Sequence, residues 1–118
     1  MPSRGVNKVI LVGNLGQDPE FRTTPSGTPV CTLRLATTER FKDKNGELQD
    51  RTEWHNVVVW RRLAEVARDY LTKGSGIYLE GKIQYRNYED KQGVTRYVTD
   101  IVADNFIMLD SKGGGSGQ

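Results

Sequence analysis

The chain has 118 residues, enough for one domain with a buried core. Its 17 lysines and arginines nearly balance its 15 aspartates and glutamates, and a net charge of +2 excludes a histone-like polycation. Its longest apolar runs are far shorter than the roughly 20 residues that cross a bilayer, and its start lacks a secretory leader pattern. We therefore expect a cytoplasmic protein without a membrane segment.

The first half of the chain predicts three strands. Residues 5–15 alternate apolar side chains over both faces, as in a strand buried on both sides, and residues 30–40 place Cys31, Leu33 and Leu35 on one face. Glycines and prolines between these strands predict turns. Residues 42–50, KDKNGELQD, predict a charged hairpin loop around an Asn-Gly turn. A third strand is expected over residues 51–60.

The period of the pattern then changes from strand to helix. Apolar residues recur at helical spacing over residues 62–72, and Gly74 is a typical helix stop. Two more strands, residues 76–88 and 94–109, are joined by a polar turn. Five strands with one short helix between the third and fourth is the order of the OB-fold, an all-β, five-stranded Greek-key barrel.

We expect two parts in the chain. Residues 1–109 form the OB-fold domain. Residues 110–118, DSKGGGSGQ, can bury no apolar surface and form a flexible, glycine-rich start of a tail. The buried face predicted for the second strand makes Cys31 a small core residue rather than a reactive thiol.

The segment TEWHNVVVWRR, residues 52–62, holds both tryptophans of the chain. Strand alternation puts Trp54 and Trp60 on one face, about 20 Å apart, so the rings cannot stack on each other. Each ring could instead receive a nucleobase, a contact worth about 1 to 3 kcal/mol. Two core tryptophans are the alternative, but the adjacent Arg61 and Arg62 favour a binding surface.

The same mixture of rings and cations recurs elsewhere. Phe41 stands between two cations at the root of the first hairpin, and residues 84–91, QYRNYEDK, place two tyrosines around Arg86. Charged hairpins are usually solvated loops, but these carry rings that a solvated loop does not need. Arg4 and Lys8 precede the first acidic residue, which fits a basic rim and a soluble strand end equally well.

Catalytic patterns are weak. Glu80-Gly81-Lys82 matches the short Glu-x-Lys pattern of some metal-dependent nucleases, but no carboxylate pair stands upstream, and alternation predicts an ordinary surface pair of Glu80 with Lys82. One histidine and one cysteine exclude multi-histidine and cysteine-cluster metal sites. We expect a non-enzyme with no catalytic residue, no metal and no cofactor. An RNA-binding OB-fold module and a purely structural assembly partner remain alternatives to a DNA-binding protein.

Two long segments, residues 3–20 and 52–83, closely resemble the bacterial single-stranded DNA-binding protein family, and the likeness extends over residues 3–109. This resemblance implies an OB-fold that assembles as a homotetramer. It also implies sequence-independent binding and protection of single-stranded DNA during replication, recombination and repair, in the nucleoid of the cytoplasm.

The resemblance also implies roles for individual residues. Stacking aromatics of the family fall on Phe41, Trp54, Trp60 and Tyr88. Its backbone-contacting cations fall on Arg4, Lys8, Arg22, Lys44, Arg62, Lys73 and Arg86. Its subunit contacts include His55 and Tyr78.

This sequence departs from the family pattern in three respects. Trp60 is larger than the phenylalanine that is common at this position, which would strengthen stacking there. Relatives often carry tryptophan where Phe41 and Tyr88 stand, and smaller rings stack less strongly. The family usually ends in a short acidic tip that recruits replication and repair proteins, whereas this sequence stops at GGGSGQ. We expect either a shortened chain or a protein that does not recruit those partners through a tip.

Overall fold

The computed structural model describes residues 4–109, and the predicted tail, residues 110–118, lies outside this range. Within it the elements are β1 (Val9–Leu15), β2 (Glu20–Thr23), β3 (Pro29–Lys42), β4 (Leu48–Trp60), α1 (Arg62–Tyr70), β5 (Gly76–Glu89) and β6 (Thr95–Met108). All five predicted strands and the predicted helix are present. The short strand β2 is additional, and it lies where the sequence predicted only turns.

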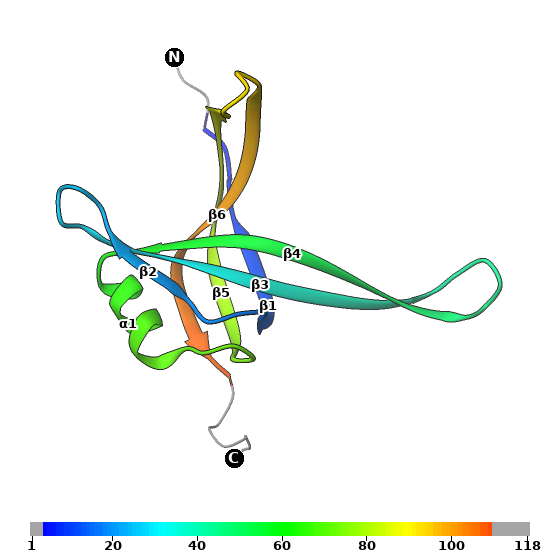
Figure 1. The fold of residues 1–118 in the computed structure, drawn as a ribbon. Coiled ribbons are helices and arrows are strands. Elements are labelled where there is room, and N and C mark those ends of the chain that lie inside the picture. Colours follow the sequence, from blue (N-terminus) through cyan, green and yellow to red (C-terminus); the bar gives the residue numbers. More distant parts are fainter. Residues whose placement is uncertain (1–3, 110–118) are drawn as a thin grey trace.

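Five of the strands close into a barrel in the order β1-β5-β6-β4-β3, and β3 pairs with β1 to complete the circle. β4 and β6 run parallel where they meet, whereas the other pairs are antiparallel. This closed Greek-key arrangement confirms the expected OB-fold. β2 adds to the outer side of β3 (Figure 1). No helix in the described part of the chain is long and apolar enough to cross a membrane.

The core fills the barrel and continues under α1. Alternate residues of β3, β4 and β5, such as Leu33, Val57 and Leu79, are fully buried, as expected for strands with one face toward the core. Ala64 and Ala67 of α1 join the same cluster. Cys31 is buried among these residues, and burial raises the pKa of its thiol to about 11. The thiol is therefore protonated at neutral pH, which confirms the prediction of a small core residue.

Two hairpins extend well beyond the barrel as long arms (Figure 1). We call them the β3–β4 arm and the β5–β6 arm. Pairing in the first continues to Lys42 opposite Leu48, so only residues 43–47 form its turn. The predicted loop over residues 42–50 was therefore too long, because polar residues that looked like a loop pair across the arm. As a result Phe41 lies next to the tip of the arm, not at its root.

The turns at the ends of the two arms have the same construction. In each, an aspartate, Asp43 or Asp90, accepts hydrogen bonds on Oδ1 from the backbone N–H groups two and four residues later, at 2.9 and 3.0 Å. A glycine follows three residues after each aspartate, with φ of +81° at Gly46 and +80° at Gly93. Glycine adopts this left-handed backbone without a steric cost. Each turn is thus fixed by one carboxylate and one glycine.

Candidate nucleic-acid interface

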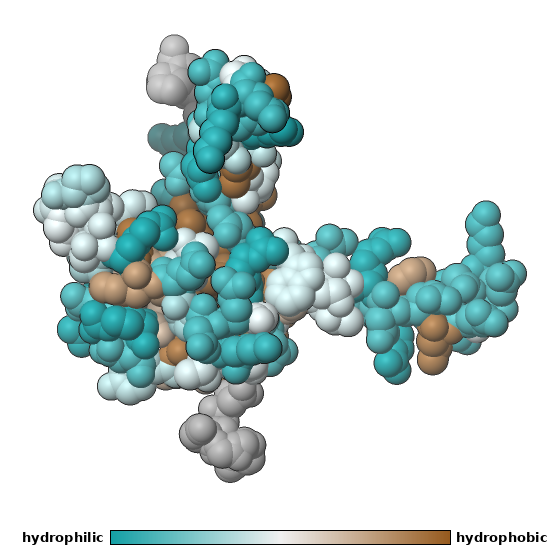
Figure 2. All heavy atoms as spheres, in the orientation of Figure 1, coloured by the Kyte–Doolittle hydropathy of each residue, from teal (hydrophilic) through white to brown (hydrophobic). Residues whose placement is uncertain are grey.

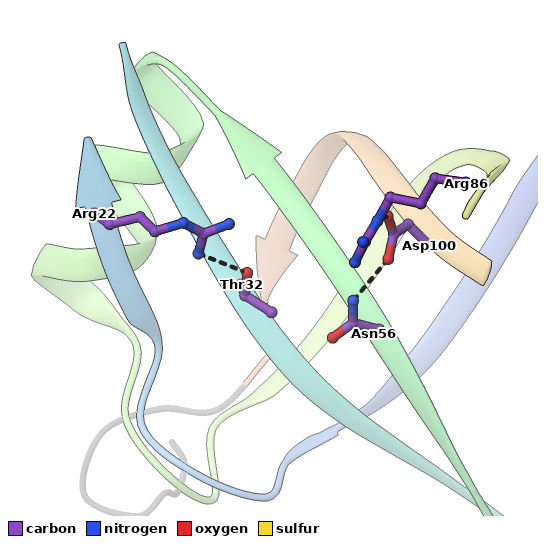
Figure 3. A network of polar contacts seen from close by, with 5 residues as sticks. All are labelled: Arg22, Thr32, Asn56, Arg86 and Asp100. Carbon is purple, nitrogen blue, oxygen red and sulfur yellow. Dashed lines mark hydrogen bonds and ion pairs between the residues drawn. The ribbon is translucent and has the colours of Figure 1, made fainter. Parts of the chain in front are cut away.

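The outer face of the barrel has a hollow of about 330 Å³ where β2 to β6 meet. Its polar and aromatic lining comes from alternate positions of these strands: Arg22, Thr32, Asn56, Trp60, Gln84, Arg86 and Asp100. Three valines complete the lining. Figure 3 shows how five of the polar residues face one another across the hollow. The face of the molecule in Figure 2 is mainly hydrophilic, with hydrophobic residues visible only in small areas.

Both tryptophans lie outside the core. Trp60 lines the hollow and is 42% exposed, and Trp54, on the same face of β4, is 52% exposed. The Arg34 guanidinium lies 5.8 Å from the centroid of the Trp54 ring. A Cβ added to Gly16 would come within 2.3 Å of the same ring, so the ring rests on this glycine. These contacts hold the Trp54 ring in place while leaving about half of it open.

The two smaller predicted rings lie on different faces. Tyr88 follows Gln84 and Arg86 along the same face of β5, so it is exposed on the hollow side of the β5–β6 arm. On β3, Phe41 lies on the same face as the buried Leu35. Trp54 of β4 lies on the opposite face of the sheet. The Arg51 guanidinium covers the Phe41 ring at 5.0 Å from the centroid. Only three of the four predicted rings therefore share the outer face.

A buried carboxylate forms the floor of the hollow. Asp100 is 5% exposed and is the one buried charged residue in the described range. Its Oδ1 accepts a hydrogen bond from Asn56 Nδ2 and its Oδ2 accepts one from Arg86 Nε, both at 2.7 Å (Figure 3). The bond from Arg86 to Asp100 raises the pKa of the guanidinium, which stays charged. Two donors thus compensate the burial of this charge.

The seven predicted backbone cations do not gather at one point. Arg22 and Arg86 line the hollow, and Arg22 Nη1 donates to Thr32 Oγ1 at 3.2 Å. Lys8 forms an ion pair with Glu80 at 3.2 Å. The other four lie before β1, in the β3–β4 turn, at the start of α1 and just after α1: Arg4, Lys44, Arg62 and Lys73. All four are exposed to solvent.

Glu80 and Lys82 lie on the same outward face of β5, as alternation predicts, but Glu80 forms its ion pair with Lys8 and not with Lys82. The register shift opposite Glu80 and Gly81 places its extra residue, Asp104, on β6, so the alternation of β5 is unbroken. The Glu80 carboxylate instead accepts hydrogen bonds from Lys8 Nζ and from the Tyr78 hydroxyl, the latter at 2.7 Å. Across residues 4–109, no group of three or more His, Cys, Asp or Glu side chains is arranged to hold a metal ion.

The two predicted subunit contacts lie in different places. Tyr78 stands directly opposite Val12 of β1 and Ile107 of β6. These two residues and Ile10 are each 55% exposed, and with Tyr78 they form what we call the apolar patch. His55 lies at the base of the β3–β4 arm, where its Nε2 is 2.9 Å from Thr37 Oγ1.

Sequence reasoning did not select several residues that line the hollow. Asn56 stands between Trp54 and Trp60 on the face that alternation gives to both tryptophans, but its residue type alone indicates no role. The sequence around Asp100 gives no indication that this residue lines a binding surface. Its place in the hollow follows from the pairing of β5 with β6, which sets Gln84 opposite Asp100. Thr32 likewise reaches the hollow through the pairing of β3 with β4.

Comparison with known proteins gives consistent matches. The model of the single-strand binding protein family matches residues 6–109. The chain is 49% identical over 116 residues to "Single-stranded DNA-binding protein 1" of Chlorobaculum tepidum, covering 98% of this chain and 72% of that protein. It is 50% identical over 112 residues to "Single-stranded DNA-binding protein" of Neisseria meningitidis, covering 95% of this chain and 64% of that protein.

Solved structures with the same fold include two that align over most of the chain. One is a Plasmodium falciparum SSB complex with ssDNA, with a TM-score of 0.86, 30% identity, and coverage of 93% of this chain and 100% of that one. The other is a deletion mutant of the single-stranded DNA binding protein from Thermus aquaticus. Its TM-score is 0.80 at 32% identity, over 94% of this chain and 54% of that one.

Proposed function

This chain belongs to the single-strand binding protein family, and from that membership we propose that it binds single-stranded DNA without sequence preference and protects it during replication, recombination and repair. The observation that carries this proposal is the exposed Trp60 ring on a hollow that also contains Arg22 and Arg86. A π face for the base and cations for the backbone are the two parts that such binding requires.

The proposed mechanism separates attraction from retention. Lysines and arginines draw in the phosphate backbone and release its counterions, which makes affinity fall as salt rises, with a slope near 0.7 per phosphate neutralised on a single strand. The rings then hold unpaired bases by stacking. Duplex DNA keeps its base faces inside the stack, so it should bind poorly.

We propose unequal roles for the predicted rings. Trp54, Trp60 and Tyr88 share the outer face and would stack on successive parts of one strand. Phe41, on the other face of the β3–β4 arm, would contact DNA only where the strand passes around that arm. The proposed phosphate contacts are Arg22 and Arg86 in the hollow, with Arg4, Lys8, Lys44, Arg62 and Lys73 along the outer path.

Assembly into a homotetramer is part of the proposal. The apolar patch supports it, because three half-exposed aliphatic side chains around Tyr78 would be covered by a second copy of the chain. Lys8, Glu80 and Tyr78 are linked by hydrogen bonds in the same region, which would add polar contacts to such an interface. His55 would serve a separate contact at the base of the β3–β4 arm.

The proposed role is binding in the nucleoid of the cytoplasm, without catalysis. The nuclease-like pattern at residues 80–82 supports no reaction, because the Glu80 carboxylate is held by hydrogen bonds from Lys8 and Tyr78, and no group of three metal-binding side chains is found among residues 4–109. Incubation of a labelled strand with Mg²⁺ checks this part of the proposal. We expect the strand to remain intact, and cleavage that follows the protein through purification would contradict a binding-only role.

The binding proposal is tested with a fluorescently labelled oligo(dT) and unlabelled competitors. The measurement is made at two salt concentrations. We expect oligo(dT) to bind tightly at both, and unlabelled single strands of random sequence to compete with it. Duplex DNA of equal length should compete poorly. Competition by oligo(U) equal to or better than that of oligo(dT) would favour RNA as the ligand. Equal competition by duplex would contradict a role for exposed base faces.

A further inference from the structure

Two of the three rings on the outer face lie close to an arginine that is already proposed as a phosphate contact. Val30 of β3 pairs with Trp60 on one side and with Arg22 on the other, so this ring and this arginine lie in one row across the sheet. Tyr88 follows two residues after Arg86 on the same face of β5. A ring with a neighbouring arginine therefore occurs twice on this face.

Trp54, the third ring, has the same kind of neighbour in Arg34. Arg34 pairs with Asn56 of β4, and Asn56 is two residues from Trp54 on the same face. The Arg34 guanidinium lies 5.8 Å from the centroid of the Trp54 ring. Arg34 thus stands between the levels of the two tryptophans, about 7 Å along the strand from Trp54 and about 13 Å from Trp60.

The charge of Arg34 is the least compensated of the three arginines. Arg86 is ion-paired with Asp100, and Arg22 donates a hydrogen bond to the Thr32 hydroxyl. The half-buried Arg34 side chain forms no ion pair and no hydrogen bond with any other residue of the range 4–109. The residues next to it on the outer face carry no charge: Thr32, Ala36, Trp54 and Asn56. An anion bound here would meet an arginine with no competing carboxylate.

We propose that Arg34 is a further phosphate contact, which holds the backbone of the strand between the nucleotides at Trp54 and Trp60. Its planar guanidinium can donate two N–H groups to one phosphate while its face stays against the Trp54 ring. This inference rests on the proposed function. It deepens that function by adding a residue that the family resemblance did not include among the backbone-contacting cations.

The test measures dissociation constants for oligo(dT) over a range of salt concentrations. Arg34→Gln removes the charge and keeps much of the length and polarity of the side chain. Arg68→Gln is the matched control, because it also removes a guanidinium that lies over an aromatic ring, 4.6 Å from the centroid of Phe21. Phe21 and Arg22 alternate on β2, so Arg68 lies on the side of that strand away from the hollow.

We expect Arg34→Gln to weaken binding of oligo(dT) by about tenfold at low salt. Its salt slope should become shallower by about 0.7, the value for one phosphate on a single strand. The loss should be equal for oligo(dT) and oligo(dC), since a phosphate contact carries no sequence information. Arg34→Lys, which retains the charge, and Arg68→Gln should both keep the slope. An unchanged slope in Arg34→Gln, or an equal loss of slope in Arg34→Lys or Arg68→Gln, would overturn the inference.

A Trp54→Ala background separates a phosphate contact from mere support of the ring. If Arg34 acted only by holding the ring, Arg34→Gln would have no effect once the ring is absent, and that result would overturn the inference. We expect the slope to fall by about 0.7 in this background also.

A second variant, Arg34→Thr, covers the case in which Arg34→Gln does not fold, because threonine favours strands. It also removes the charge, so the same loss of slope is expected. Failure of the unaltered protein to bind oligo(dT) would contradict the proposed function itself, whereas binding with an unchanged slope in these variants contradicts only the role of Arg34.

Discussion

Trp60 combines an open ring face with a fixed place on the hollow. Replacing it by alanine removes the stacking surface but little core packing, because Trp60 lies outside the hydrophobic core cluster. We expect Trp60→Ala to weaken binding of oligo(dT) by about 1 to 3 kcal/mol, measured by titration of a labelled strand. Tyr70→Ala, which removes an exposed ring from α1, is the control and should leave affinity unchanged. Full affinity in Trp60→Ala would remove this ring from the site.

Arg61 has an unusual backbone at the junction of β4 and α1. Its φ of 57° and ψ of −123° match the first central residue of a type II′ turn, which glycine favours. Among residues 4–109 it is the one non-glycine residue with positive φ. Its N–H donates to the Pro29 carbonyl at 2.8 Å, which fixes the turn. The sequence could not predict this, since the same residue read as the next alternating position of the strand.

Relief of this backbone strain predicts a gain in stability. Arg61→Gly should raise the free energy of unfolding by about 1 kcal/mol, because the strain removed exceeds the entropy that glycine adds to the unfolded chain. Thermal unfolding of the two proteins measures the change. Arg62→Gly, one residue later and already helical, should give no gain. A lower melting temperature for Arg61→Gly would show that the Arg61 side chain contributes more than its backbone costs.

The two arm turns show how far local sequence predicts an element. An Asn-Gly pair correctly located the first turn, but the length of the strands around it was underestimated. Asp50 looks like a loop residue in the sequence, yet it pairs in register with Arg40 and forms an ion pair with it at 3.0 Å. Its strand conformation depends on cross-strand contacts that a single strand does not reveal. For the same reason β2 was missed, since it is stabilised by pairing with β3.

The carboxylate in each arm turn makes the arms sensitive to acid. The pKa of Asp90 is lowered by the N–H of Val94, by Arg96 and by the N–H of Gln92. A pKa lowered in the folded state contributes stability above the unfolded value, near 3.9, and this contribution is lost as pH falls through the folded value. We expect the melting temperature to fall when the pH drops below about 4.

A substitution assigns this acid sensitivity to the turn. Asp90→Ala should lower the melting temperature at neutral pH and reduce the further loss on acidification. Lys91→Ala, in the same turn but without a hydrogen bond from its side chain to the described residues, should behave as the unaltered protein. If the melting temperature of Asp90→Ala falls on acidification as much as that of the unaltered protein, the acid sensitivity comes from other carboxylates. Asp43, whose pKa is lowered by the same kind of hydrogen bonds, is one of them.

At the scale of the whole molecule, the sequence predicted the barrel, the helix position and two exposed tryptophans on one face of β4. It did not predict that Phe41 would lie on a different face from Trp54, because the register of the β3–β4 arm had to be known over its full length. The carboxylate of Asp100 was missed because β6 reaches the hollow only through its pairing with β5. Local periodicity thus indicates which residues alternate, whereas long-range pairing determines which of them meet.

The apolar patch makes the proposed assembly testable at the same scale. Val12→Asp places a charge beside Tyr78, where a second subunit would bury it, and should shift the protein to smaller species in sedimentation velocity. Tyr70→Asp changes an exposed ring outside the patch and should leave the sedimentation coefficient unchanged. A monomer in the unaltered protein, or an unchanged assembly in Val12→Asp, would contradict the role of this patch.

The central claim is that unpaired bases lie against exposed tryptophan rings of this barrel, and intrinsic tryptophan fluorescence measures it most directly. We predict saturable quenching by oligo(dT), a smaller but persistent quenching in each of Trp54→Phe and Trp60→Phe, and little quenching by duplex or by an oligomer of abasic nucleotides of the same length. Tight binding of oligo(dT) with no change in the fluorescence of either tryptophan would contradict the account.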